Sequence, residues 1–187
     1  MQREVHDPAR RQRYVFRRTG PDTDGRLLEV EVWAAPGGDV PRHVHPHQEE
    51  RFEVLAGSMT FEVGGRRRRL VAGDRLAVPP GTPHAFVNDG DEEAHLMVEV
   101  RPALELQAFL EAAAGLSRAR KISSRGVPRS PRALLEVAIL ARHFREATYL
   151  TRPPLVVQRV MTAALAALGR LFGMSAPALV DAARRTP

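Results

Sequence analysis

Two stretches of sequence decide the fold: GGDVPRHVHPHQEERFEVLAG at residues 37–57 and GDRLAVPPGTPHAFVN at residues 73–88. In the first stretch one residue separates His43 from His45, so on a β-strand both side chains point to the same face. Glu50 can reach that face from the next strand, across a short turn. In the second stretch His84 follows a Pro-Pro-Gly-Thr-Pro turn, which fixes where the following strand begins.

Three imidazoles and one carboxylate suit a first-row divalent metal ion and leave coordination positions open for water, O₂ or a substrate. The 187-residue chain contains no cysteine, which excludes disulfides, thiolate nucleophiles and cysteine-ligated metal centres. Any metal must therefore be held by His, Asp or Glu. These ligand types accept most first-row ions, so the sequence does not choose among iron, manganese, zinc, nickel and copper.

Short β-like runs separated by Gly, Pro and Asp turns surround the two stretches, from Tyr14 to Arg101. Apolar and polar residues alternate over Leu27–Ala34, as expected for a half-buried strand. Gly64 and Gly65 tolerate the positive φ of a two-residue hairpin. We expect strands at residues 13–17, 27–34, 51–55, 59–63, 67–71, 75–78, 84–88 and 95–100. Many short strands at regular spacing predict a mainly β sandwich or barrel.

Both stretches resemble, position for position, the two motifs of the cupin superfamily. Their motif positions are glycines 37 and 57 around His43, His45 and Glu50, and then Gly73, Pro79, Gly81, His84 and Asn88. The resemblance covers residues 26–101, and the 15 residues between the motifs match the spacing of compact cupins. It implies a double-stranded β-helix, or jelly-roll barrel. It also carries the metal-ligand roles over to His43, His45, Glu50 and His84.

Two residues are candidates for acid–base catalysis. By resemblance to three-His, one-Glu cupin oxygenases, Glu50 doubles as a base if its bond to the metal is labile. His95 shares one face of the last predicted strand with Met97 and Glu99. If that face points inward, His95 is a pocket acid or base, or it supports a metal ligand; otherwise it is a surface residue. Strand alternation also predicts a cavity lined by Phe52, Val54, Phe86 and Asn88.

Charge is unevenly divided along the chain. Residues 1–101 carry a net charge of −2, from 15 Arg against 17 acidic residues, and residues 102–187 carry +8, from 13 basic residues against 5 acidic ones. The densest basic run, Arg66–Arg69, suits a phosphate or nucleic-acid contact, or protects the edge strand of a sheet. Aromatic residues do not interleave with this run. We therefore predict edge protection and no nucleic-acid partner.

The sequence changes to a helical pattern after residue 101. Helices are expected at residues 103–116, 131–148, 155–174 and 177–184, with a basic linker at 117–130. Ser130 and Pro131 are the N-cap and first residue of the second helix. The third helix, Leu155–Met174, is apolar over most of its circumference, which suits a buried helix, a partner-bound helix or a membrane-surface helix. Arg159 and Arg170 argue against a membrane-spanning helix.

We predict a cupin-like barrel at residues 1–101 followed by a basic α-helical extension at residues 102–187. The favoured function is a metal-dependent enzyme acting on a small organic substrate, with dioxygenase-type or isomerase-type chemistry. The alternative is a non-catalytic module that binds a metal or small molecule and docks a partner or a membrane surface through its basic tail. A homodimer is expected, because cupins commonly pair through their sheets. The N-terminus has no apolar signal segment, so we expect a cytoplasmic protein.

Overall fold

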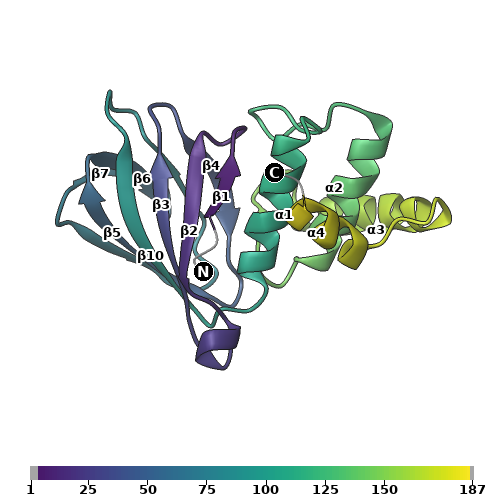
Figure 1. Cartoon of the computed structure of the whole chain (residues 1–187), viewed down its shortest axis with the longest axis horizontal. Helices are drawn as coiled ribbons and strands as arrows, with labels where there is room; N and C mark the ends of the chain where they lie inside the picture. Colours follow the sequence, from purple (N-terminus) through teal and green to yellow (C-terminus); the bar gives the residue numbers. More distant parts are fainter. Residues whose placement is uncertain (1–3, 186–187) are drawn as a thin grey trace.

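The computed structural model describes residues 4–185 and has a β-barrel on one side and a helical region on the other (Figure 1). Two antiparallel sheets form the barrel, with strand orders β1-β2-β3-β10-β5-β8 and β11-β4-β9-β6-β7. The strands are β1 Glu4–Asp7, β2 Gln12–Arg18, β3 Leu28–Ala34, β4 Asp39–Val44, β5 Glu49–Ala56, β6 Ser58–Val63, β7 Arg66–Val71, β8 Arg75–Val78, β9 His84–Val87, β10 Ala94–Arg101 and β11 Tyr149–Leu150. The predicted mainly β jelly roll is confirmed.

Alternation along the strands places one apolar face of each sheet in a common core. In β10, for example, Leu96, Val98 and Val100 are buried while the residues between them are partly exposed. The inner faces of the two sheets contribute to one cluster of buried apolar side chains, which includes Phe52, Phe61 and Phe86. This packing fixes the register of each strand, because a shift by one residue would expose its apolar set.

Two turns depend on glycine. Gly57, between β5 and β6, has φ 70°, and a Cβ there would lie 2.7 Å from the carbonyl oxygen of Glu93. Gly64 and Gly65 both have positive φ and join β6 to β7. The predicted hairpin at this position is confirmed, since a two-residue turn with two positive φ angles matches the twist of the strands it joins.

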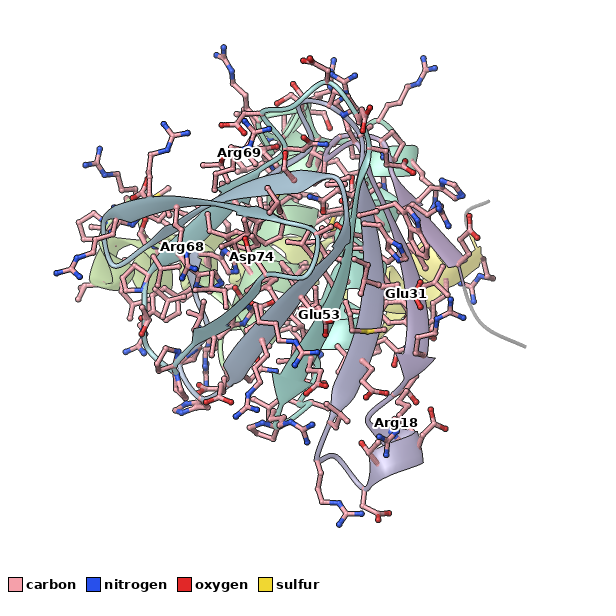
Figure 2. The ribbon with its side chains drawn as sticks, turned by 90° about the vertical axis from the view of Figure 1, so that its left-hand side faces the viewer. Arg18, Glu31, Glu53, Arg68, Arg69 and Asp74 are labelled. Atoms are coloured by element: carbon pink, nitrogen blue, oxygen red, sulfur yellow. The ribbon has the colours of Figure 1, made fainter. Side chains whose placement is uncertain are left out.

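The four arginines Arg66–Arg69 are exposed on β7, which is the outermost strand of its sheet. Figure 2 shows Arg68 and Arg69 on this side of the barrel. Arg69 donates a hydrogen bond to Ser58 at 2.9 Å, and Arg67 lies 3.6 Å from Asp89. The placement agrees with edge protection, because charge on an edge strand opposes pairing with another chain.

Four helices follow the barrel: α1 Leu106–Arg118, α2 Pro131–His143, α3 Leu155–Leu171 and α4 Ala176–Arg185. Helix α1 lies between the barrel and the other helices (Figure 1). It bridges two cores, since Leu106 packs with the barrel cluster and Leu116 packs with Leu140 and Phe144 in a second cluster. Apolar packing therefore attaches the helical region to the barrel, in addition to the covalent connection of the chain.

The second predicted helix, residues 131–148, is wrong at its C-terminal end. Its start is as expected, because Ser130 caps the helix by accepting from the backbone N–H of Ala133. The helix ends at His143, and the chain then turns so that Tyr149–Leu150 forms β11 beside β4. Hydrogen bonds to this sheet edge replace those of a longer helix, which local helix propensity could not anticipate.

The sequence pattern does not predict strands β1 and β4, which the structure contains. Pro41 lies inside β4 and lowers the strand signal of that segment, although proline is tolerated at irregular positions of a sheet. The pairing of β4 with β9 is irregular between Val40 and His43. His43 therefore sits just after this irregularity, opposite His84 on β9.

Candidate metal centre

The four predicted ligands come together inside the barrel. His43 lies on β4, His45 directly after it, Glu50 on β5 and His84 at the start of β9. All four side chains are buried, and one ligand atom from each lies within 4.8 Å of the others. The two-residue spacing of His43 and His45 and the cross-strand pairing of His43 with His84 produce this convergence.

The distances between the ligand atoms fit a single metal ion. His43 Nε2 is 3.1 Å from His45 Nε2, and Glu50 Oε2 is 2.9 Å from His84 Nε2 and 3.5 Å from His45 Nε2. Two ligands bound at about 2.1 Å and at right angles to each other would be about 3.0 Å apart. The donor set therefore has the spacing of adjacent ligands around one first-row ion.

Each histidine is oriented by its second ring nitrogen. The Nδ1 atoms of His43, His45 and His84 donate to the carbonyl oxygens of Pro41, Ala147 and Thr82 at 2.9, 2.6 and 3.0 Å, respectively. Because a carbonyl oxygen only accepts, these bonds put the ring proton on Nδ1. In this tautomer each Nε2 atom carries the lone pair that a metal binds, and at His84 a metal would replace the proton shared with Glu50 at 2.9 Å.

The shifted pKa values of His43 and Glu50 favour metal binding, whereas that of His84 favours the protonated ring. Burial, together with the neighbouring His84 and His45, lowers the pKa of His43 to about 3. Burial by itself raises the pKa of Glu50, but His45 and His84 outweigh it and bring the pKa to about 2. A neutral imidazole and an ionised carboxylate are the forms that bind metals. At His84, burial is outweighed by the hydrogen bond to Glu50, which raises the pKa of the ring.

The helical extension takes part in this centre, which sequence reasoning missed. The carbonyl of Ala147 accepts from His45, and β11 pairs with β4 so that Leu150 lies opposite His43. The backbone N–H of Thr151 also donates to the carbonyl of Arg42 at 3.2 Å. A backbone carbonyl leaves no side-chain signal in the sequence, so no motif could have revealed the role of Ala147.

A cavity of about 560 Å³ adjoins the cluster and includes His43, His45 and Glu50 in its wall. On the barrel side, apolar residues dominate the wall, among them Val30, Val32, Phe52, Phe86 and Val98. Helices α1, α2 and α3 supply the other side, for example Phe109, Val137 and Leu155. Of the four predicted lining residues, Phe52 and Phe86 line the cavity, Val54 packs in the core, and Asn88 donates to the backbone carbonyls of Ala34 and Glu92.

The structure places His95 away from the four-residue cluster, and this corrects its proposed role as a pocket acid or base. On β10 the neighbouring Leu96 faces the core, so the ring of His95 lies on the outer face. There it stacks on Trp33 with ring centroids 4.2 Å apart and bonds to Glu31 at 2.9 Å. His47, in the turn before β5, is exposed and pairs with Glu146 at 3.1 Å.

Comparison with known proteins identifies the barrel. Residues 30–100 match the sequence model of the cupin domain. This match covers the strands that carry all four cluster residues. The barrel of this chain belongs to the cupin superfamily.

Relatives of known name match the same part of the chain. Quercetin 2,3-dioxygenase of Bacillus subtilis is 35% identical over 83 residues, which are 40% of this chain and 24% of that protein. Polyketide synthase CurC of Streptomyces cyaneus is 34% identical over 96 residues, 46% of this chain and 62% of that protein. The solved polyketide cyclase RemF of Streptomyces resistomycificus is 27% identical with a TM-score of 0.47, covering 55% of this chain and 74% of that one. The chain thus spans less than two thirds of the length of these two sequence relatives.

Proposed function

We propose that the protein is a metal-dependent enzyme acting on a small organic substrate, with dioxygenase-type or isomerase-type chemistry. One observation carries this proposal: three histidine Nε2 atoms and the Glu50 carboxylate converge beside a largely apolar cavity of about 560 Å³, and His43, His45 and Glu50 form part of its wall. Cavities of this size and lining suit small organic molecules. The names of the relatives, which include a dioxygenase and a polyketide cyclase, agree with this class.

The residues of the centre have distinct tasks in this proposal. His43, His45, His84 and Glu50 would hold one divalent ion, which supplies a Lewis acid and, if it is iron, manganese or copper, a redox partner. The backbone carbonyls fix the three rings, so the ligands need no rearrangement on binding. The apolar wall excludes water and positions the substrate beside the ligands. Glu50 accepts a proton from the substrate if its carboxylate leaves the ion.

Elemental analysis is the first test. The purified, untagged protein is compared with a His43→Ala/His45→Ala double variant, before and after incubation with each candidate ion. We expect one equivalent of metal that the variant does not retain. Oxygen uptake and NMR-detected rearrangement are then followed over one panel of small organic compounds, with His45→Ala as the inactive control. If neither preparation holds metal, even after incubation, the proposal is wrong.

A second candidate function is a non-catalytic binding module that docks on an anionic membrane. Helix α3 packs on α2, with Gly169 against Ile139, and leaves an apolar stripe exposed on its other side. The stripe consists of Val157, Val160, Met161, Leu168 and Leu171, and Leu171 is 83% exposed. Among the described residues no single helix is long and apolar enough to cross a membrane, although α3 and α4 together, bent by 79°, meet the length and composition limits.

Vesicle flotation separates this candidate from the enzyme. Binding to vesicles that contain phosphatidylglycerol, absent from pure phosphatidylcholine and lost in Leu171→Gln, would favour docking through α3 and its basic surroundings. A second copy of the chain is the competing occupant of the stripe, because we also propose a homodimer. Light scattering that gives the mass of one 20.7 kDa chain would reject the dimer.

A further inference from the structure

The cavity has a second polar end, formed by the β1–β2 hairpin. Asp7, Arg10, Gln12 and Tyr14 line the same cavity as the metal cluster. Gln12 is 5% exposed and Tyr14 is 4% exposed, so both side chains are effectively removed from solvent. Neither residue belongs to the cupin motifs, and the four-residue cluster does not use them.

One side-chain atom at this end, Gln12 Nε2, has no hydrogen-bond partner in the part of the chain that the structure describes. The Tyr14 hydroxyl donates to Gln12 Oε1 at 2.9 Å, and burial, followed by Asp7, raises the pKa of Tyr14 well above its ordinary value, so the hydroxyl keeps its proton. With Oε1 engaged, the amide nitrogen of Gln12 is left buried without a hydrogen-bond acceptor among residues 4–185. An unsatisfied buried N–H costs free energy unless something else accepts from it. A bound molecule in the cavity would do so.

The charges nearby restrict what that molecule carries. The Asp7 carboxyl group lines this end, and the guanidinium of Arg10 already lies 3.6 Å from Asp39. At this end a ligand carboxylate would face the carboxyl group of Asp7, beside an arginine that is already paired with Asp39. A neutral oxygen acceptor, such as a ketone or amide carbonyl, fits the Gln12 amide without this penalty.

The sheet register sets the length of the ligand. Gln12 lies opposite Ala34, which pairs with Ala94 on β10, whereas Glu50 lies opposite Val100 on the same strand. Six residues along a strand correspond to about 20 Å. Apolar side chains, among them Val30, Val32 and Val98, line the cavity between these two ends. A ligand that reached both ends would be elongated and largely apolar.

We propose that Gln12 is a specificity residue that binds a neutral carbonyl oxygen of an elongated, largely apolar ligand, at the end of the cavity remote from the metal cluster. This inference rests on the proposed function, since it names the substrate class of the same cavity. Tyr14 is a positioning residue, because its hydroxyl donates to Gln12 Oε1 and so occupies the acceptor of the amide, leaving the N–H groups as its open donors.

Two probes of nearly equal shape test the proposal: 2-acetylnaphthalene, which has a carbonyl oxygen, and 2-isopropylnaphthalene, which has a methyl group in its place. Equilibrium dialysis measures the dissociation constant of each. The wild-type protein is expected to bind the ketone about tenfold more tightly than the hydrocarbon. In Gln12→Met the two affinities should become equal, because the methionine side chain has similar length and no donor. Gln107→Met, on α1 and outside the cavity wall, should keep the wild-type ratio.

The outcomes separate this proposal from the function it rests on. Equal affinities for the two probes in the wild-type protein would overturn the role of Gln12. The same conclusion would follow if Gln12→Met left the ratio of the ketone and hydrocarbon dissociation constants unchanged. A ratio that survives Gln12→Met and disappears when a chelator strips the metal would mean that the carbonyl binds at the cluster, and would also overturn it. If Gln12→Met does not fold, as judged by circular dichroism, Tyr14→Phe replaces it and should lower the ratio. Failure of the proposed function would instead appear as absence of metal and turnover.

Discussion

His45 Nδ1 lies 2.6 Å from the carbonyl oxygen of Ala147, a residue 102 positions later in the chain. This contact joins the helical extension to the barrel at a candidate metal ligand. The adjacent strand β11 completes the attachment by pairing with β4. The extension therefore forms part of the centre as well as covering the cavity.

Loosening β11 should weaken metal binding. Thr151→Pro removes the backbone N–H that donates to Arg42, so the Ala147 carbonyl is held less firmly against His45. Loss of such a supporting contact typically lowers metal affinity by about 10- to 100-fold. Competition with a chromophoric chelator measures the change. Thr151→Ala keeps the N–H and is the matched control. Equal affinities in the two variants would show that β11 does not support the centre.

Metal should stabilise the folded protein through the four ligands. A ligand present at 100 times its dissociation constant stabilises the native state by about 2.7 kcal/mol. Scanning calorimetry with added metal should therefore show a higher melting temperature for the wild-type protein and little change for Glu50→Gln. A control, Glu49→Gln, alters the neighbouring residue outside the cluster. A similar shift in Glu50→Gln would argue that the ion binds elsewhere.

The pair formed by Glu31 and Arg17 should make stability depend on pH. A hydrogen bond from Arg17 at 2.6 Å is the largest influence on Glu31 and lowers its pKa below the usual 4.5, burial opposes it, and His95 lowers the pKa further. The native state therefore binds fewer protons than the unfolded one. The stabilisation is present above pH 4.5 and is lost as the pH falls through the lowered value.

Urea unfolding at several pH values tests this pair. Glu31→Gln should be less stable than the wild-type protein at pH 7, and the difference should shrink as the pH falls below 4.5. Glu29→Gln is the control. The Glu29 carboxylate lies 3.6 Å from Arg18, and this pair is more exposed to solvent than the pair of Glu31 and Arg17. Figure 2 shows Glu31 on the face of the barrel that points toward the viewer. A constant difference at all pH values would contradict the assignment.

Removing an aromatic ring from the barrel core should cost far more than removing a surface side chain. Phe61 is fully buried, with its ring centroid 4.8 Å from that of Phe52 and 5.5 Å from that of Phe86. Phe61→Ala is expected to lower the free energy of unfolding by about 3–5 kcal/mol. Val71→Ala, at an exposed position of the edge strand, should change it by less than about 1 kcal/mol. Urea unfolding compares the two variants.

Strand alternation and glycine turns could be predicted from the sequence, because they depend on local chemistry. A strand exposes alternate side chains to the core, and positive φ strongly favours glycine, so β3 and the Gly64–Gly65 hairpin follow from the residues themselves. His95 shows the limit of this reasoning. Alternation groups it with Met97 and Glu99, but which face of β10 points inward depends on the sheet that packs against it.

The sequence by itself predicted a mainly β sandwich or barrel, because strand alternation and turns are local properties, and its resemblance to the cupin motifs implied the jelly roll and the four candidate ligands. Tertiary structure alone decided how the extension contributes. The Ala147 carbonyl, the β11–β4 pairing and the Gln12 amide nitrogen gain their roles from distant neighbours. Backbone groups are nearly the same in every residue, so their long-range hydrogen bonds leave little trace in the sequence.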